Sequence, residues 1–408
     1  MIKRLFFLVC CSALLLSGCG GASAPEEPNA SELKDLTVAQ SELEETGDFP
    51  AYSAQIQTTP AQTKAREVVD GMNYFSFHTD TKIYQNEEGQ DLLWDTFTDP
   101  VFYSPDTQLH DWVNGVLDGI CKSETKLSQD LLDYAEEEQE RIGEEFYSFS
   151  HYFTLGVGRH DTKVASVMAL SSMYSGGPHP SSIQTSVNLD MHQLQVLTLE
   201  NVLEEGAEAK LLTMVLDCVQ DTFAAVGEEG LYSDYAVTVE NALTWGNMTS
   251  HWYFNEVGLV VFFNQYELAP FAAGIIKAEL PYGTLGGILR QEYLPEVYTG
   301  TASGVDISKT RPSAGEICPV SYGDGQTLYL RVEGKASHVQ LSNVYFAEGV
   351  PVGETMLFSA NFLDDSVTIA LQGDWNDGET VYGVEYSDAE GGPYVIYSTS
   401  AEIWNELS

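Results

Sequence analysis

The chain has 408 residues and a formal net charge of −43, from 61 acidic residues against 18 lysines and arginines. This balance argues against nucleic acid and against an anionic lipid surface as partners, since phosphate binding needs clustered bases. The length is sufficient for two or three domains, each with its own core. Two interpretations of the negative charge remain open: it keeps an exported protein soluble, or it steers a cationic partner toward the protein.

The N-terminus has the pattern of an export signal. Lys3 and Arg4 precede a short apolar run over residues 5–16, which predicts a secretory signal peptide over residues 1–18. The run is too short to remain as a membrane span, although an uncleaved anchor is the alternative. Leu16-Ser-Gly-Cys19 resembles the lipobox of bacterial lipoproteins. The resemblance implies lipidation of Cys19 and attachment to the lipid bilayer at the outer, extracytoplasmic face of the bacterial cytoplasmic membrane.

Residues 19–62 are rich in Ala, Ser, Pro, Glu and Thr, which predicts a disordered tether. Removal of Lys3 and Arg4 with the signal would bring the net charge from −43 to −45. Folded structure is expected from residue 63. Its first half, about residues 63–175, is predicted to contain these elements: strands at 75–84 and 92–103, helices at 106–120 and 128–142, and strands at 146–157 and 163–173.

The stretch from 174 to 203 has the clearest local pattern. Gly176 and Gly177 allow backbone angles that other residues avoid, and prolines 178 and 180 forbid a helix across the turn. Residues 183–192 then alternate between apolar and polar side chains, which predicts a strand with one face in water. A return strand is expected at 194–197, and Thr198 is expected to cap a short helical turn.

The second half, about residues 176–296, continues with a strongly amphipathic helix over 207–226 that Gly227 should end. An apolar strand is predicted over 252–263, entered by a turn at 255–258. A loop at 264–274, a strand at 275–280 and a short helix at 282–289 follow. Strands and helices that do not strictly alternate indicate an α+β fold, with antiparallel sheets and packed helices over about 65–295, as one domain over 63–296.

From about residue 297 to residue 408 the helical stripes end and short alternating runs take their place. This alternating pattern predicts a separate all-β domain, a small sandwich or barrel. The expected strands lie at 328–332, 339–346, 356–362, 367–371, 381–386 and 394–397.

The sequence contains no complete motif for catalysis, metal binding or cofactor binding. The eight histidines lack the spacing of a zinc helix, and there is no nucleophile elbow, phosphate-binding loop or dinucleotide fingerprint, so we expect no catalytic residue, no metal and no cofactor. Ser123-Glu-Thr-Lys126 fits the Ser-x-x-Lys motif of penicillin-binding enzymes, but its companion motifs are absent and helix capping is favoured. The run from Asp374 to Glu379 carries possible calcium ligands, but their order favours a hairpin turn.

Three cysteines remain after Cys10 and Cys11 leave with the signal peptide and Cys19 takes a lipid. We interpret Cys121 and Cys218 as small buried apolar residues on helices. Cys318 is the third. One disulfide among them is possible, but the sequence does not assign it.

Two signatures carry a resemblance to a known family. The first is Tyr174-Ser-Gly-Gly-Pro-His179 with the helix start at 197–203, and the second combines 254–264 with Tyr266-Glu-Leu-Ala-Pro-Phe-Ala-Ala-Gly274. Over about 65–292 the chain resembles a domain of unknown function from the extracytoplasmic part of lysozyme-sensing anti-sigma factors (RsiV-like). The same domain precedes the catalytic domain of PdaC-type peptidoglycan deacetylases. Only a few residues precede the apolar run, so we expect no cytoplasmic segment that holds a sigma factor.

The predicted function follows from the resemblance, the lipobox and the charge. We expect a binding or sensor protein that recognises a cell-wall component, such as peptidoglycan, or a cationic wall-directed protein such as lysozyme. The candidate binding residues are Tyr174, His179, Tyr266 and Glu267. For His179 the favoured interpretation is a side chain that ties down its own turn, and Glu267 either caps its loop or contacts a ligand. The alternatives are a peptidoglycan-modifying enzyme or an accessory subunit of one, and an architectural spacer.

Overall fold

The computed structural model describes residues 72–224, 230–244, 251–295, 300–309, 311–312, 316–321, 326–347, 350–373 and 380–399. About 50% of these residues lie in strands and about 27% in helices. The mixture of helices and sheets confirms the coarse fold prediction, but the structure contains more sheet than that prediction implied. The predicted signal peptide, Cys19 and the tether lie outside the described residues, as do Gly227 and the run from Asp374 to Glu379.

Six strands from the first half of the chain follow one another in the large sheet: β1 (Tyr74–Gln85), β2 (Asp91–Tyr103), β3 (Phe149–His160), β4 (Val164–Tyr174), β5 (Ser181–Asp190) and β6 (Gln195–Val196). Neighbours pair antiparallel except β2 and β3, which pair parallel. The prediction of antiparallel sheets thus holds for most of these pairs, but the β2–β3 pair makes the large sheet mixed. A helix connects β2 to β3, and such a crossover returns the chain in the same direction.

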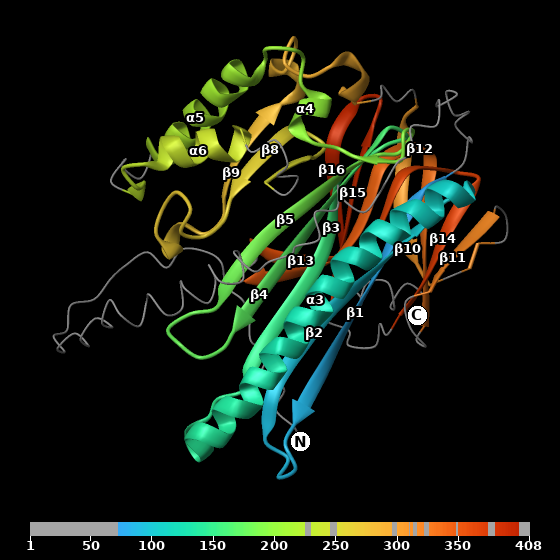
Figure 1. Cartoon of the computed structure of the whole chain (residues 1–408). Coiled ribbons are helices and arrows are strands. Elements are labelled where there is room, and N and C mark those ends of the chain that lie inside the picture. Colours follow the sequence, from blue (N-terminus) through green and yellow to red (C-terminus); the bar gives the residue numbers. More distant parts are fainter. Residues whose placement is uncertain are drawn as a thin grey trace. The chain divides into compact units, whose positions relative to one another are not determined.

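That connection is α3 (Thr107–Ile142), a single helix where the sequence predicted two. Asp106 caps its start by accepting hydrogen bonds from the backbone N–H groups of Gln108 and Leu109. The expected break at 123–126 does not occur, because the hydroxyls of Ser123 and Thr125 bond to carbonyls four residues earlier inside the helix. The helix packs along the strands of the large sheet, mainly β2 (Figure 1).

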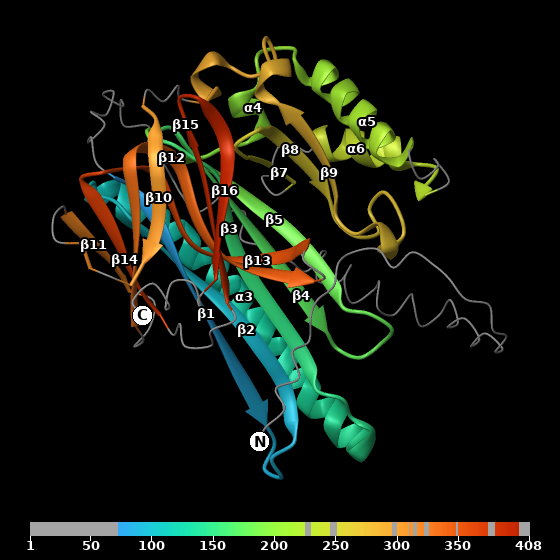
Figure 2. The ribbon, with the colours of Figure 1, turned by 180° about the vertical axis from the view of Figure 1, so that it is seen from behind.

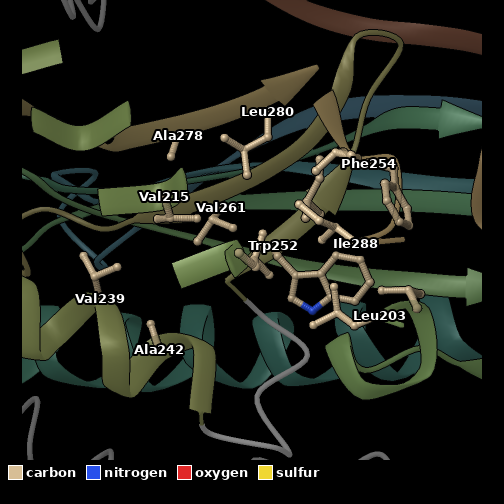
Figure 3. Close-up of a cluster of buried hydrophobic side chains, with 14 of the residues drawn as sticks. Leu203, Val215, Val239, Ala242, Trp252, Phe254, Val261, Ala278, Leu280 and Ile288 are labelled. Atoms are coloured by element: carbon tan, nitrogen blue, oxygen red, sulfur yellow. The ribbon is translucent and has the colours of Figure 1, made fainter. Parts of the chain in front are cut away.

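A smaller antiparallel sheet contains β7 (Trp252–Phe254), β8 (Gly258–Phe263) and β9 (Ile276–Pro281). The single strand predicted over 252–263 is thus a hairpin, whose turn carries Asn255. The helices α4 (Leu199–Val202), α5 (Glu208–Ala224) and α6 (Tyr235–Thr244) accompany this sheet. Figure 3 shows their shared core, in which side chains from both helices and strands surround Trp252. The short helix expected at 282–289 is limited to a 3₁₀ turn, Tyr282–Thr284.

Seven further strands complete the chain: β10 (Ala302–Ser308), β11 (Glu316–Ser321), β12 (Gln326–Ala347), β13 (Val350–Asp364), β14 (Val367–Gly373), β15 (Val381–Asp388) and β16 (Gly391–Thr399). β12 merges two predicted strands. His338, in its middle, has a φ of 50° at an irregularity in the pairing with β15. β13 pairs with both β12 and β1, so these strands extend the sheet of the first half (Figure 2). The domain division at residue 297 stays a prediction.

The polar face of β5 is covered, whereas the sequence predicted a face in water. Its polar side chains Gln184, Ser186, Asn188 and Asp190 are buried. The Oγ atom of Ser186 and the Nδ2 atom of Asn188 both donate hydrogen bonds to the carbonyl of Trp252, at 2.6 and 2.7 Å. This contact joins the large sheet to β7. The alternation in the sequence was correct, but a later segment supplies the polar partners on the second face.

Candidate binding surface

The loop between β4 and β5 has a shape that requires its glycines. Gly176 and Gly177 have φ values of 88° and 114°, in the left-handed region that favours glycine. The hydroxyl of Tyr174 donates a hydrogen bond to the carbonyl of Gly177 at 3.2 Å. Tyr174 therefore holds the shape of the loop that presents His179.

His179 meets two aromatic residues from the loop after β8. Its ring stacks on Phe271 with centroids 3.7 Å apart and planes inclined by 16°. Its Nδ1 atom lies 3.1 Å from the carbonyl of Pro180, which can only accept, so Nδ1 carries the proton. Nε2, 3.0 Å from the hydroxyl of Tyr266, then accepts a hydrogen bond in the neutral ring. We call His179, Tyr266 and Phe271 the aromatic platform.

The platform is open to solvent on the Tyr266 side. Tyr266 is 50% exposed and has a φ of 68°, a conformation uncommon for a residue other than glycine. His179 and Phe271 are half-buried. An exposed tyrosine held at an unusual backbone angle by its neighbours is a common feature of binding loops. The platform is therefore a fixed aromatic surface that is open to solvent on one side.

Side-chain amides hold the Tyr266 loop against β5. Asn264 exchanges two hydrogen bonds with the backbone of Gln184: its Oδ1 atom accepts at 2.7 Å and its Nδ2 atom donates at 3.1 Å. The Oε1 atom of Gln265 accepts from the backbone N–H of Ser182 at 3.2 Å. These bonds imitate strand pairing along an edge of β5, and they fix the distance between the two loops that form the platform.

Glu267 is directed into its own loop. Its Oε2 atom accepts a hydrogen bond from the backbone N–H of Asn264 at 2.7 Å, and its Oε1 atom lies 3.1 Å from Nε2 of His251. Of the four predicted binding residues, the structure thus brings His179 and Tyr266 into direct contact, whereas Tyr174 and Glu267 shape the two loops. Phe271 was missed, although its position directly after Pro270 in the same loop was a usable signal.

A strongly acidic segment lies at the C-terminal end of α3. From Asp133 to Glu145 the chain carries seven acidic residues and one base, Arg141, whose Nε atom donates to Glu138 at 2.8 Å. Six of the acids are exposed, together with Tyr134 and Tyr147. Acidic side chains are repelled by the partial negative charge at a helix C-terminus, so they destabilise the helix there. Helix stability therefore does not explain their presence. We call residues 133–145 the acidic helix end.

The pairing of the sheet places the platform loop and the acidic helix end toward the same end of the large sheet. β3 begins at Phe149, four residues after the acidic helix end. Ser150 of β3 pairs with Tyr174 of β4, which leads directly into the loop of His179. Aromatic and acidic surface is therefore presented on neighbouring connections.

Beneath α3, a buried charged network surrounds His151. Its Nδ1 atom lies 2.7 Å from Asp95 and its Nε2 atom 2.9 Å from Glu124. Burial alone would lower the pKa of His151, but the hydrogen bonds to the two carboxylates raise it to about 9. Ser128 donates to Asp95 at 2.8 Å, and Ser171 donates to Glu124. The imidazolium thus ties α3 to the sheet. Because its side chain is fully buried, its role is structural.

A second buried set of charges lies where β3 turns into β4. Arg159 donates to Asp161 at 2.6 Å, and its guanidinium lies 5.4 Å from the ring centre of Phe254. Lys163 pairs with Asp190 at 2.6 Å. Arg159, Asp161 and Asp190 are buried, whereas Lys163 is partly exposed. Arg159 also donates to the carbonyls of Tyr293 and Leu294, so these charges hold the turn in place.

The chemical motifs of the sequence receive structural explanations. Ser123 lies inside α3 with its hydroxyl bonded to the carbonyl of Gly119, so it is not arranged as a nucleophile. In the described residues, no group of three or more His, Cys, Asp or Glu side chains is placed to hold a metal ion. None of the helices in the described part combines the length and apolar composition that crossing a membrane requires.

Two cysteines lie on helices as predicted, but they are half-buried and not fully buried. Cys121 and Cys218 lie on α3 and α5, half-buried, and both are free thiols. Burial, followed by the nearby charge of Asp99, raises the pKa of Cys121 to about 12, so this thiol is unreactive at neutral pH. The side chain of Cys318 lies outside the described part of the structure.

Comparison with known proteins gives a partial family assignment. No curated protein matches the chain. A solved structure of a DUF3298 family member from Bacteroides fragilis is 18% identical, with a TM-score of 0.40, and the match covers 53% of this chain and 94% of that one. A DUF3298 family protein from Pseudomonas aeruginosa is 16% identical, with a TM-score of 0.38 and coverage of 54% and 96%. Residues 231–283, which include Tyr266 and Phe271, match the family described as "Protein of unknown function (DUF3298)", and the chain therefore contains a DUF3298 domain over these residues.

Proposed function

We propose that this protein is a lipid-anchored binding protein of the bacterial cell envelope that recognises a cationic wall-directed protein such as lysozyme. The observation that carries the proposal is the acidic helix end, with seven acids against one base beside exposed Tyr134 and Tyr147. Opposite charge steers a cationic protein toward such a surface, and exposed tyrosines supply contact area once it has arrived.

Three further observations support the same proposal. The whole chain carries a net charge of −43, so a cationic partner is attracted over a distance as well as at the contact. The aromatic platform offers a second fixed surface toward the same end of the sheet, with Tyr266 half-exposed. The resemblance of the two signatures to RsiV-like domains agrees with a lysozyme-type partner.

Calorimetric titration of the purified protein with lysozyme tests the proposal. We expect binding at low salt that weakens at moderate salt, because ions screen exposed charges. The paired variant Glu136→Lys/Glu140→Lys should weaken binding at least tenfold. Asp217→Lys/Asp221→Lys is the matched control, since it makes the same charge change at exposed positions four residues apart on α5. An equal loss in both variants would reduce the effect to net charge. If lysozyme binds neither at low nor at moderate salt concentration, lysozyme is rejected as the partner.

The anchoring half of the proposal has its own test. We expect mass spectrometry of the membrane-bound protein to find Cys19 as the lipidated first residue, and Cys19→Ser to release the protein from the membrane fraction. An unmodified, secreted chain would contradict the anchor. Turnover of muropeptides by the purified protein would replace the binding function with the enzymatic alternative.

A further inference from the structure

Two carboxylates lie on the face of the C-terminal strands that packs against β3. Gln340 of β12 pairs with Glu385 of β15, and Val344 of β12 pairs with Glu354 of β13. Paired residues share a face of the sheet, and positions 340 and 344 lie on the same face because they are an even number of residues apart. The Nε2 atom of Gln340 donates a hydrogen bond to the carbonyl of Val157 at 2.9 Å. Glu385 and Glu354 are therefore directed toward the end of β3.

A third carboxylate reaches the same place from the smaller sheet. Glu256 lies in the turn between β7 and β8, and its Oε1 atom is 3.1 Å from the Nδ1 atom of His338 on β12. The side chain of Glu256 is 11% exposed and that of His338 is 9% exposed. β12 has one extra residue in this part of its pairing with β15, and His338, with its φ of 50°, lies in this bulge. Bulges commonly redirect a side chain, and here the histidine meets the turn of the other sheet.

The three carboxylates act on one another's charge. Glu385 is half-buried. Its burial, followed by the charges of Glu256 and Glu354, raises its pKa to about 7, whereas His338 acts against this rise. Burial also raises the pKa of Glu256, and the contact with His338 opposes the rise. Each carboxylate is thus costly to ionise while the others are charged.

The charges that β3 contributes to this place are bound to one another. Arg159 donates to Asp161 at 2.6 Å and to the carbonyl of Leu294 at 3.1 Å. They act on Glu256 in opposite directions, because Arg159 lowers its pKa and Asp161 raises it. His160 is uncharged at neutral pH, since burial lowers its pKa to about 3. The guanidinium of Arg159 is therefore committed to other partners and is not the counter-charge of the three glutamates.

We propose that Glu256, Glu354 and Glu385, together with His338, form a pH-sensitive latch between the β7–β8 turn and the C-terminal strands. In acid, protons neutralise the crowded carboxylates and remove their mutual repulsion, so the turn stays against β12. As the pH rises, the carboxylates ionise and the contact loosens. The loop of Tyr266 follows β8 directly, so the latch makes the hairpin that leads into the aromatic platform more mobile at high pH. This device does not depend on the proposed function.

The direction of the pH response follows from the pKa of Glu385. The value of about 7 in the closed latch is above the ordinary 4.5 of a glutamate, so closing the latch takes up a proton. The closed form has its full advantage below pH 4.5 and loses it as the pH rises through about 7. Between pH 5.5 and pH 7.5, the opening equilibrium should rise roughly tenfold.

Hydrogen–deuterium exchange of the full chain at pH 5.5 and pH 7.5, corrected for the intrinsic effect of pH on exchange, tests the latch. The reporters are the N–H of Asn255, which is bonded to the carbonyl of Gly258 at 3.0 Å, and the amides of residues 336–340. Their protection should fall roughly tenfold at the higher pH in wild type. In Glu385→Gln, which removes the charge and keeps the size of the side chain, protection should stay high. Glu333→Gln, at an exposed position on β12, is the matched control and should follow wild type.

Amides of residues 79–98, in the β1–β2 hairpin, separate local opening from unfolding of the whole chain, and we expect their protection to be equal at the two pH values. Three results would overturn the proposal. The first is equal protection of the reporters at both pH values in wild type. The second is a Glu385→Gln variant that keeps the wild-type loss. The third is an equal loss in residues 79–98, which would assign the pH response to global stability.

Discussion

Two histidines at opposite ends of β3 are equally buried but differ in charge. His151 lies between Asp95 and Glu124, and those hydrogen bonds raise its pKa to about 9. His160 packs against Phe75 and Phe102, and burial lowers its pKa to about 3. Neither ring nitrogen of His160 has a hydrogen-bond partner among the described residues. Burial makes charge costly at both sites, and the hydrogen bonds to Asp95 and Glu124, which His160 lacks, keep the charge on His151.

The difference also indicates what each histidine contributes. The charged ring of His151 joins a helix to a sheet through directional bonds, so its neighbours depend on it. His160 acts as a flat apolar side chain among aromatic rings. His179 is unlike both, because it is half-buried and its hydrogen bond leads to an exposed tyrosine. Of these three, only His179 is placed to meet a partner.

The largest expected effect comes from replacing the buried ring of His151, with the same change at His160 as its comparison. His151→Leu leaves the Asp95 and Glu124 carboxylates buried without a counter-charge, and such losses cost about 3–5 kcal/mol of unfolding free energy. His160→Leu removes two unsatisfied nitrogens and keeps an apolar side chain, so we expect a change below about 1.5 kcal/mol. Urea denaturation of both variants at pH 7 measures the contrast. Similar losses in the two variants would show that the charged network contributes little.

The positions of the first two strands were predictable from the sequence. Strands predicted at 75–84 and 92–103 match β1 and β2 to within one residue at each end, because alternating aromatic side chains define them locally. The helix start at Thr198 was likewise predictable, although the bond from the Thr198 backbone N–H to the Asn201 side chain at 2.8 Å was not foreseen. The continuity of α3 was not, because a serine inside a helix and a serine at its start are alike in sequence and differ only in the carbonyl that they reach.

Long-range contacts were beyond the sequence. His179 and Tyr266 were each named as candidates, but they are 87 positions apart and nothing local showed that they touch. Ser186 and Asn188 were predicted to lie on a solvent-exposed face, because β7, which accepts their hydrogen bonds, comes more than 60 residues later. His151 and Glu124 were not recognised as partners for the same reason. Patterns of period two or 3.6 identify faces of elements but not what lies against them.

The second largest effect is expected in acid. The pKa of His160 is lower in the folded chain than its ordinary 6.5, so the unfolded chain binds the proton more readily. Stability is therefore lost as the pH falls below 6.5, by about 2 kcal/mol between pH 6.5 and pH 4.5 from this residue. Denaturation curves at several pH values should show a shallower acid loss in His160→Leu than in wild type. His78→Gln, at an exposed position on β1, is the control and should follow wild type.

The smallest effect has the opposite sign and lies at alkaline pH. The folded pKa of His151, about 9, is above the ordinary 6.5, so its contribution is complete below pH 6.5 and is lost as the pH rises through about 9. We expect wild type to lose about 1–2 kcal/mol between pH 7 and pH 8.5 from this residue. His151→Leu should be less stable throughout but nearly flat over this range, whereas His160→Leu should keep the alkaline loss. If His151→Leu retained the wild-type slope, the proton would be held elsewhere, and the contrast between the two ends of β3 would lose its electrostatic explanation.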